Sequence, residues 1–568
     1  MRRALLAAAV LASGCSLPLS HGVTTVRSAQ GSVEQPAGIQ VIPNPPKPGQ
    51  SPREIVAGFL AAEANSDDQH ADARLWLTNR EAIAWDDDAD VQVYRPGPEI
   101  TGSDDGSGQV TVAMDVAGVV DADGRYSPAS SDTRLTEPYE LQLTSAGWRL
   151  SRVPDGLRIT APDLERSYRA QDIYYVAVSG DQDEQPHLVP DRVFLPRTSL
   201  DLDGQLVRRL LHPPSGALVG SVTTGMPPGF VPTLRSVTHH ADGVVDVDLG
   251  GSLASFSTEQ LQDLSARLVW TLRDDPTFGG LMLRNDGRSV RVPGVSAVQD
   301  SGAWESYDPS GLGVAPPYFF TSARRLRSSL PSIPSTALTA GTVSDPGSIP
   351  VDGLAVSSDR TQVAALTETS RGVDVHIGPF QRGTTYPTLA SAPGLSAPTW
   401  GYGSSWLWLL RAGREVVRVD ATRGGISRVP FVGKPAGLLT SLAVSRDGTR
   451  AAVVAGGRVY VAQVVLADGE PRLTRAVLLS PLLSRVLQVV WSTPTELVVL
   501  GSLGGSDREV VRVASDGSST TVSSRVLGAT AIAAAGPLLL VTANDALYTV
   551  DRSATLSQTK VGLAVYPG

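Results

Sequence analysis

Beyond residue 340 the chain contains an internal repeat, which restricts the fold more than any other feature of the sequence. The segment LAVSSDRT, which begins at Leu354, matches LAVSRDGT, which begins 88 residues later at Leu442. A related segment around Trp400 lies near the midpoint, and further copies contain Trp491 and Ile532. Each copy is followed by a second, alternating segment typical of a strand. A period of about 44 residues made of short strands and polar turns is typical of a four-stranded propeller blade.

The five copies predict that residues 301–568 form an all-β propeller of five or six blades. A ring of blades needs closure, because closure removes exposed sheet edges that would otherwise pair with neighbouring molecules. We expect the segment Pro317–Leu326 to supply an outer strand of the terminal blade.

Two groups of side chains in the repeat allow a structural or a functional interpretation. Asp359 and Asp447 occupy equivalent turns, and an aspartate at a repeated turn is typically structural rather than a ligand. The tryptophans Trp400, Trp406 and Trp408 are either part of the blade core, which we favour, or a platform on which sugars stack.

The first fifteen residues have the pattern of an export signal. Arginines follow Met1, an apolar run extends from Ala4 to Ala12, and small residues precede Cys15. The run is too short to span a hydrocarbon core of about 30 Å. This ending resembles a bacterial lipobox, although Ala12 stands where a lipobox usually has leucine. The resemblance implies that residues 1–14 are removed and that Cys15 carries S-diacylglycerol and N-acyl (palmitate) chains.

The alternative is a plain secretory signal with a chance cysteine at Cys15. Cys15 is the only cysteine of the chain, so an exported form cannot use it for an internal disulfide. Lipidation gives this thiol a role, and two acyl chains hold a protein at a membrane where one is marginal. The sequence therefore predicts a lipid-anchored protein at the extracytoplasmic face of the cell membrane. Residues 15–51 are polar and then proline-rich, and we interpret them as a tether that reaches at most on the order of 100 Å.

Composition excludes one class of partner. The chain has 568 residues, 41% of them hydrophobic, and a formal net charge of -9. Broad electrostatic attraction to nucleic acid is therefore not expected.

Residues 52–160 predict an α+β domain. Ile55, Phe59 and Leu60 recur at helical spacing, and a second short helix is expected to contain Ala73 and residues 75–77. Alternating segments follow, which indicates an antiparallel, cystatin/NTF2-like sheet curled around a helix.

An acidic run in this domain, Asp86 to Asp88 with Asp90, has the oxygen ligands that calcium prefers. It lacks the glycine-spaced loop of an EF-hand, and we favour a solvated turn.

Residues 161–300 predict a second α+β domain. Strand-like segments at 173–178, 188–194 and 244–249 alternate with helical ones, the longer of which extends from Ser257 through Leu272. Ser257 and Gln260 have the spacing of a capping box at its start.

The order of these segments resembles a GerMN domain. The residues that carry the resemblance are LLHPP at 210–214, GMPPG at 225–229, VVDVDL at 244–249 and RLVWTLRDDP at 267–276. GerMN domains occur in exported bacterial proteins linked to cell-wall and sporulation functions, and the resemblance implies binding rather than catalysis.

Together, the lipobox, the two α+β domains and the propeller resemble the lipoprotein LpqB family of GC-rich Gram-positive bacteria. The resemblance implies an accessory protein of the MtrAB two-component system, which contacts the extracellular domain of the sensor histidine kinase MtrB. Envelope homeostasis and cell division would then lie downstream, and no cofactor or metal is expected.

The competing hypotheses are binding of cell-wall glycan or peptide, and a propeller hydrolase that acts on envelope material. The sequence has neither a Gly-x-Ser-x-Gly nor a His-Glu-x-x-His motif. Residues 557–560 fit Ser-x-x-Lys without its partner motifs, and His239 and His240, as neighbours in a strand, are expected to face opposite ways. We therefore predict no catalytic residues and no enzyme activity.

Overall fold

The computed structural model describes most of the chain beyond residue 44. The described residues are 45–568 without 66–69, 103–106, 179–184, 231, 311, 313–315, 323–324, 330–335, 338, 341–346, 349–350, 381–385, 506, 545, 551–554 and 559–561. Cys15, the predicted signal and most of the predicted tether lie outside the described residues. Among the described residues, no helix has both the length and the hydropathy that a membrane span requires.

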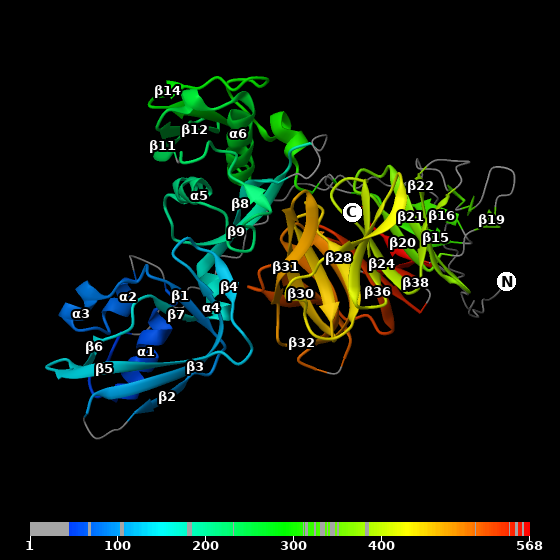
Figure 1. Cartoon of the computed structure of the whole chain (residues 1–568). Helices are drawn as coiled ribbons and strands as arrows, with labels where there is room; N and C mark the ends of the chain where they lie inside the picture. Colours follow the sequence, from blue (N-terminus) through cyan, green and yellow to red (C-terminus); the bar gives the residue numbers. More distant parts are fainter. Residues whose placement is uncertain are drawn as a thin grey trace, which may run out of the picture. The chain divides into compact units, whose positions relative to one another are not determined.

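The first domain packs helices against a sheet, as the sequence predicts for an α+β domain (Figure 1). Its elements are α1 (Pro52–Ala62), α2 (Ala71–Arg74), α3 (Asn79–Ala84), β1 (Val91–Tyr94), β2 (Glu99–Gly102), β3 (Gln109–Val120), β4 (Tyr126–Pro128), β5 (Arg134–Thr144), β6 (Gly147–Arg152) and β7 (Leu157–Thr160). The sheet order is β6-β5-β3-β1-β7, with β2 and β4 also paired to β3. Every pair is antiparallel except β1 with β7. Helix α1 buries Ile55 and Phe59 and contacts β2, β3 and β6. The more specific cystatin/NTF2-like assignment stays a prediction.

The predicted second helix is shorter than expected. Helix α2 ends at Arg74, so residues 75–77 lie beyond it. The backbone of this segment pairs with β6 instead: the Leu150 amide donates to the Trp76 carbonyl (3.0 Å), and the Thr78 amide donates to the Leu150 carbonyl (2.7 Å). Pairing with a distant strand thus overrides the local helical spacing.

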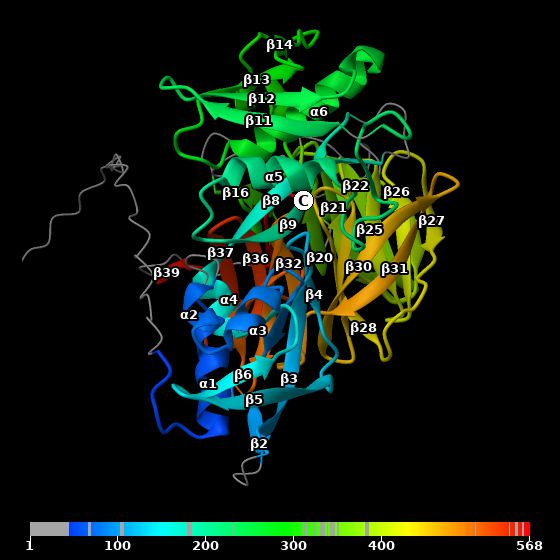
Figure 2. The ribbon, with the colours of Figure 1, turned by 90° about the vertical axis from the view of Figure 1, so that its left-hand side faces the viewer.

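The second domain has two small sheets that share a core with two helices (Figure 2). Its elements are α4 (Ala161–Ser167), β8 (Tyr168–Ala177), β9 (Leu188–Pro196), α5 (Leu202–Leu211), β10 (Val222–Thr223), β11 (Thr233–His239), β12 (Val244–Gly250), η1 (Leu253–Ser255), α6 (Thr258–Leu272), β13 (Gly280–Asn285), β14 (Arg288–Ser289) and η2 (Ser301–Tyr307). The sheet orders are β10-β8-β9 and β11-β12-β13-β14. The predicted capping box at the start of α6 is confirmed. The backbone N–H of Gln260 donates to the Ser257 hydroxyl (3.1 Å), and the backbone N–H of Ser257 donates to the side-chain oxygen of Gln260 (2.9 Å).

The C-terminal region is all-β, as predicted. Its strands are β15 (Phe319–Ser322), β16 (Arg325–Ser328), β17 (Thr336–Ala337), β18 (Thr339–Ala340), β19 (Gly347–Ser348), β20 (Gly353–Val356), β21 (Gln362–Thr369), β22 (Gly372–Pro379), β23 (Thr388–Ala392), β24 (Leu395–Trp400), β25 (Trp406–Arg411), β26 (Glu415–Asp420), β27 (Gly424–Val429), β28 (Leu439–Val444), β29 (Arg450–Ala455), β30 (Arg458–Ala467), β31 (Glu470–Leu478), β32 (Leu483–Thr493), β33 (Glu496–Leu503), β34 (Glu509–Ala514), β35 (Thr520–Ser524), β36 (Ala529–Ala535), β37 (Leu538–Ala543), β38 (Ala546–Val550), β39 (Thr555–Gln558) and β40 (Ala564–Val565).

Within the described residues, this region forms six four-stranded sheets. Five of them follow the chain in order, from β20–β23 to β36–β39, and each contains one copy of the sequence repeat. All residues of β29 are buried, because this strand has a neighbouring sheet on each face.

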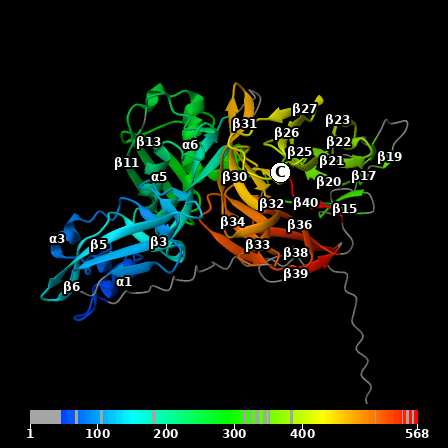
Figure 3. The ribbon, with the colours of Figure 1, turned by 60° about the horizontal axis from the view of Figure 1, so that its bottom comes forward.

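The sixth sheet joins the two ends of the region. Strand β15, from the segment that we expect to close the ring, pairs with β40 near the C-terminus (Figure 3). Strand β40 contacts both β36 and β20, and the Gly568 amide donates to the Val356 carbonyl (2.8 Å). The segment therefore takes part in closing the ring, as predicted, but it supplies β15 and the start of β16, the two middle strands of the sixth sheet, rather than an outer strand.

One buried arginine bonds to three parts of the ring. The guanidinium of Arg446 donates to the backbone carbonyls of Ser492 (3.3 Å), Ala534 (3.1 Å) and Pro567 (3.2 Å). These carbonyls belong to β32, β36 and the segment that follows β40, so a single side chain links two sheets of the ring to its C-terminal end.

Candidate functional site

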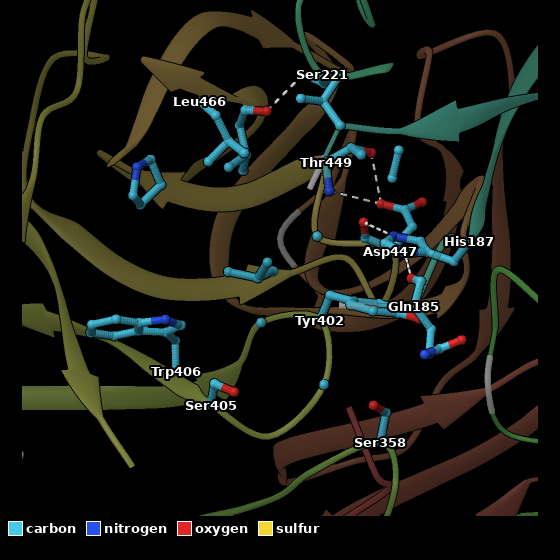
Figure 4. A pocket seen from close by; sticks show the side chains of 18 of the residues that line it. Gln185, His187, Ser221, Ser358, Tyr402, Ser405, Trp406, Asp447, Thr449 and Leu466 are labelled. Carbon is cyan, nitrogen blue, oxygen red and sulfur yellow. Dashed lines mark hydrogen bonds between the residues drawn. The ribbon is translucent and has the colours of Figure 1, made fainter. Parts of the chain in front are cut away.

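A cavity of about 770 Å³ lies where the second domain meets the propeller (Figure 4). The propeller contributes the turns between the first two strands of three successive sheets, together with strands of the second and third sheets. The second domain contributes residues next to β8, β9 and β10 and the end of η2. The residues that line the cavity include His187, Glu305, Asp308, Asp359, Tyr402, Trp406, Trp408, Arg418, Asp447 and Glu470.

The repeated turns are held by their aspartates. One carboxylate oxygen of Asp447 accepts from the hydroxyl of Ser445 (2.5 Å) and from the amide and hydroxyl of Thr449 (2.9 and 2.7 Å). Asp359 accepts equivalent hydrogen bonds within its own turn. These bonds hold both turns, as the structural interpretation predicts, and both turns border the cavity.

His187 fixes one wall of the cavity. Its ring stacks on Tyr402, with centroids 3.5 Å apart and planes 12° apart. Its Nε2 lies 2.9 Å from the backbone oxygen of Asp447. A carbonyl oxygen only accepts, so this nitrogen carries the proton.

Two further hydrogen bonds join the domains beside the cavity. The Ser221 hydroxyl donates to the Val464 carbonyl (2.7 Å), and the Gln463 amide group donates to the Val219 carbonyl (2.6 Å). Together with His187, they set the position of the second domain on strand β30 and on the turn before β29.

The three predicted tryptophans have different positions. Trp400 is buried in the core between two sheets, which confirms the core interpretation for this residue. Trp408 is also buried but borders the cavity, and Trp406 is partly exposed there. The guanidinium carbon of Arg418 lies 3.7 Å from the centroid of the Trp406 ring, and this guanidinium also bonds to Glu470.

The cavity is rich in negative charge. Five of the described residues that line the cavity are aspartates or glutamates. Among the described lining residues, Arg418 is the one arginine or lysine. Asp447 lies 3.6 Å from Arg450, which donates to two backbone carbonyls. Although partial burial opposes ionisation of Asp359, hydrogen bonds from Ser357 and Thr361 lower its pKa, so it is anionic at neutral pH.

The other predicted candidates do not gather into a site. His239 and His240 approach different carboxylates, Asp203 (3.5 Å) and Asp246 (3.2 Å), as expected for neighbours in a strand. In the acidic run of the first domain, Asp87 pairs with Arg74 (2.7 Å).

No group of three or more described His, Cys, Asp or Glu residues has a metal-binding arrangement. Ser557 lies in β39, whereas Thr559 and Lys560 lie outside the described residues.

His187, Tyr402 and Glu305 belong to the cavity but are missed by the sequence reasoning. They come from segments that are far apart in the chain, and no local motif marks them. The one available signal was the repeat, which places Tyr402 in a turn equivalent to those of Asp359 and Asp447.

Three family models match successive parts of the chain. Residues 45–165 match the lipoprotein LpqB N-terminal domain, and residues 335–561 match the lipoprotein LpqB beta-propeller domain. Residues 172–291 match the Germane model, described as sporulation and spore germination. Lipoprotein LpqB of Thermobifida fusca is 29% identical over 99% of this chain and 97% of its own length. Lipoprotein LpqB of Mycobacterium tuberculosis is 27% identical over 86% of this chain and 84% of its own.

The chain belongs to the lipoprotein LpqB family. The family models match the chain in the order that the sequence predicts: the LpqB N-terminal domain, then the Germane (GerMN) domain, then the propeller. The family name, lipoprotein, is consistent with a membrane-anchored protein outside the cytoplasm. A solved structure of TolB from Acinetobacter baumannii is 13% identical over 44% of this chain and 65% of its own, with a TM-score of 0.34.

Proposed function

We propose that this LpqB family member is a lipid-anchored accessory protein that modulates an MtrB-like sensor kinase by protein–protein contact outside the membrane. The observation that carries the proposal is the family match over nearly the whole chain. A kinase partner is implied by resemblance to the family and not by any one side chain. Envelope homeostasis and cell division would be affected through the phosphorylation of the response regulator.

The arrangement of the described side chains supports binding rather than chemistry. The turn aspartates of the cavity are engaged in turn hydrogen bonds, and His187 is held by Tyr402 and Asp447. A general base must be free to reach a substrate proton, which these contacts oppose.

Contacts between the domains also support a binding role. The Arg125 side chain of the first domain lies 3.5 Å from Asp191 of the second domain. Arg450 of the propeller donates to the carbonyl of Pro190, next to Asp191. The three domains therefore meet around β9, so a partner that binds near this strand is in reach of all three.

Membrane attachment makes weak contacts sufficient. A lipid at Cys15 and the extracellular domain of a sensor would share one membrane surface, which raises their effective concentration. Binding changes signalling only if the lipoprotein prefers one state of the sensor. The proposal therefore requires a difference in affinity between kinase states rather than tight binding.

Reconstitution tests the proposal. The full lipidated chain is placed in proteoliposomes with the full-length cognate kinase, and phosphotransfer to the response regulator is measured. We expect the rate to change about threefold or more in either direction, which corresponds to a coupling free energy of roughly 0.7 kcal/mol. The matched control is Cys15→Ser, which leaves the described domains unchanged. An unchanged rate together with cleavage of wall glycan by the same preparation would contradict the proposal.

A further inference from the structure

The cavity between the second domain and the propeller contains negative charge that the described residues do not neutralise. Glu305 and Asp308 come from the end of η2, and Asp359 comes from the turn between β20 and β21. In the part of the chain that the structure describes, none of these three carboxylates has an ion-pair partner within 4 Å. Among the described residues, Asp308 accepts only from the amide and hydroxyl of Ser310 (2.8 Å each). Three carboxylates from two domains therefore line one cavity.

The walls of the cavity already bind one cation. The guanidinium of Arg418 lies over the Trp406 ring and bonds to Glu470. An aromatic face and a carboxylate together stabilise a guanidinium or ammonium group. Tyr402, one face of which stacks on His187, lines the same cavity as three further carboxylates, so an aromatic ring and carboxylates are available to a second cation.

A hydrogen-bond donor also borders the cavity. Trp408 is buried to more than nine tenths, and its Nε1 has no hydrogen-bond partner among the described residues. The indole N–H only donates, so a peptide carbonyl that enters the cavity can accept from it. A polypeptide offers this acceptor beside a basic side chain, whereas a free metal ion does not.

We propose that this cavity receives a lysine or arginine side chain of a partner polypeptide. The cation offsets part of the negative charge of Glu305, Asp308 and Asp359, and a neighbouring carbonyl of the partner accepts from Trp408. A neutral glycan would leave the three carboxylates without compensation, which disfavours it as the occupant. The site does not depend on the kinase being the partner, because any exposed basic segment has the same chemistry.

Tryptophan indole NMR of the full mature chain tests this site. The probes are the blocked pentapeptides Gly-Gly-Arg-Gly-Gly and Gly-Gly-Lys-Gly-Gly, with the glutamine version as the neutral control and an N-acetylglucosamine trimer as the glycan. Trp406→Phe and Trp408→Phe assign the two cavity signals. The basic peptides should shift these signals with a dissociation constant of about a millimolar or less.

Matched variants separate the local charge from the net charge. Glu305→Gln with Asp359→Asn should weaken binding of the basic peptides about fivefold or more, and added salt should weaken it further. Glu165→Gln with Glu368→Gln changes the net charge equally at exposed positions and should leave binding unchanged. Unchanged signals of the other tryptophans show that the variants are folded.

Two results would overturn the proposal. One is equal binding of the glutamine peptide, or of the glycan, with no effect of the cavity substitutions. The other is the absence of any shift in the two cavity signals with basic peptides at about 10 millimolar, where even weak specific binding is detectable. Neither result bears on kinase modulation, which is measured separately by phosphotransfer.

Discussion

Replacement of Arg446 by methionine should loosen the propeller where β32, β36 and the C-terminal segment meet. Burial lowers the pKa of Arg446 to about 10, so the side chain remains protonated at neutral pH. It is therefore a charged donor to the carbonyls of Ser492, Ala534 and Pro567, in three parts of the ring. Methionine keeps most of the apolar stem but removes all three hydrogen bonds.

The magnitude follows from these bonds. A hydrogen bond to a charged group contributes about 1.5–3 kcal/mol, so three bonds at the lower limit give roughly 4–5 kcal/mol. Their lengths of 3.1–3.3 Å are above the usual value, which reduces this sum. The Ser492 carbonyl also keeps a bond from the Gly536 amide (2.6 Å). We therefore expect Arg446→Met to lower the free energy of unfolding by about 3 kcal/mol.

Hydrogen exchange of the full chain, read by mass spectrometry, measures this effect in the propeller separately from the other domains. Exchange in β32, β36 and the C-terminal segment should accelerate by roughly a hundredfold where it proceeds through unfolding of the ring. Arg472→Met, at an exposed position in β31, removes the same charge and should leave exchange unchanged. Equal protection in both variants would refute the assigned role of Arg446.

Two further substitutions test other buried polar groups. Burial raises the pKa of Glu63 well above its usual 4.5, and Arg158 opposes this only in part. The folded state then binds the proton more tightly than the unfolded state, so this contribution to stability is lost as pH rises above about 4.5. Hydrogen exchange in β7 measures the stability of Glu63→Gln and of the original chain. The stability of the variant relative to the original chain should increase between about pH 5 and 7. A difference that stays constant over this range would contradict the raised pKa of Glu63. His187→Leu should weaken the contact of the second domain with the propeller by about 2 kcal/mol and accelerate exchange at the turn before β29. The control His240→Leu, at an exposed position, should change neither. Equal exchange in the two histidine variants would show that His187 does not hold this contact.

The sheets of the propeller could be predicted because their signals are local. The repeat at Leu354 and Leu442 combines alternating apolar residues with an aspartate turn, and both determine structure within a few residues. The capping box at Ser257 is local for the same reason. The second helix of the first domain was predicted too long because residues 76–78 pair with β6, and the helical spacing contains no information about that pairing.

The cavity could not be predicted from the sequence. His187 and Asp447 are 260 residues apart, and their contact depends on how two domains meet. The role of Arg446 was hidden for another reason. It bonds to backbone carbonyls, which almost every residue has, so no partner side chain marks it in the sequence.

Regulator phosphorylation in intact cells tests most directly whether this family member modulates a kinase from a lipid anchor. Cells that express equal amounts of the original chain or Cys15→Ser are compared for membrane fractionation and for the phosphorylated fraction of the response regulator. The account predicts that the serine variant leaves the membrane fraction and that phosphorylation shifts to the level of cells that lack the protein. A variant that stays fully in the membrane fraction and supports the original level of phosphorylation would contradict it.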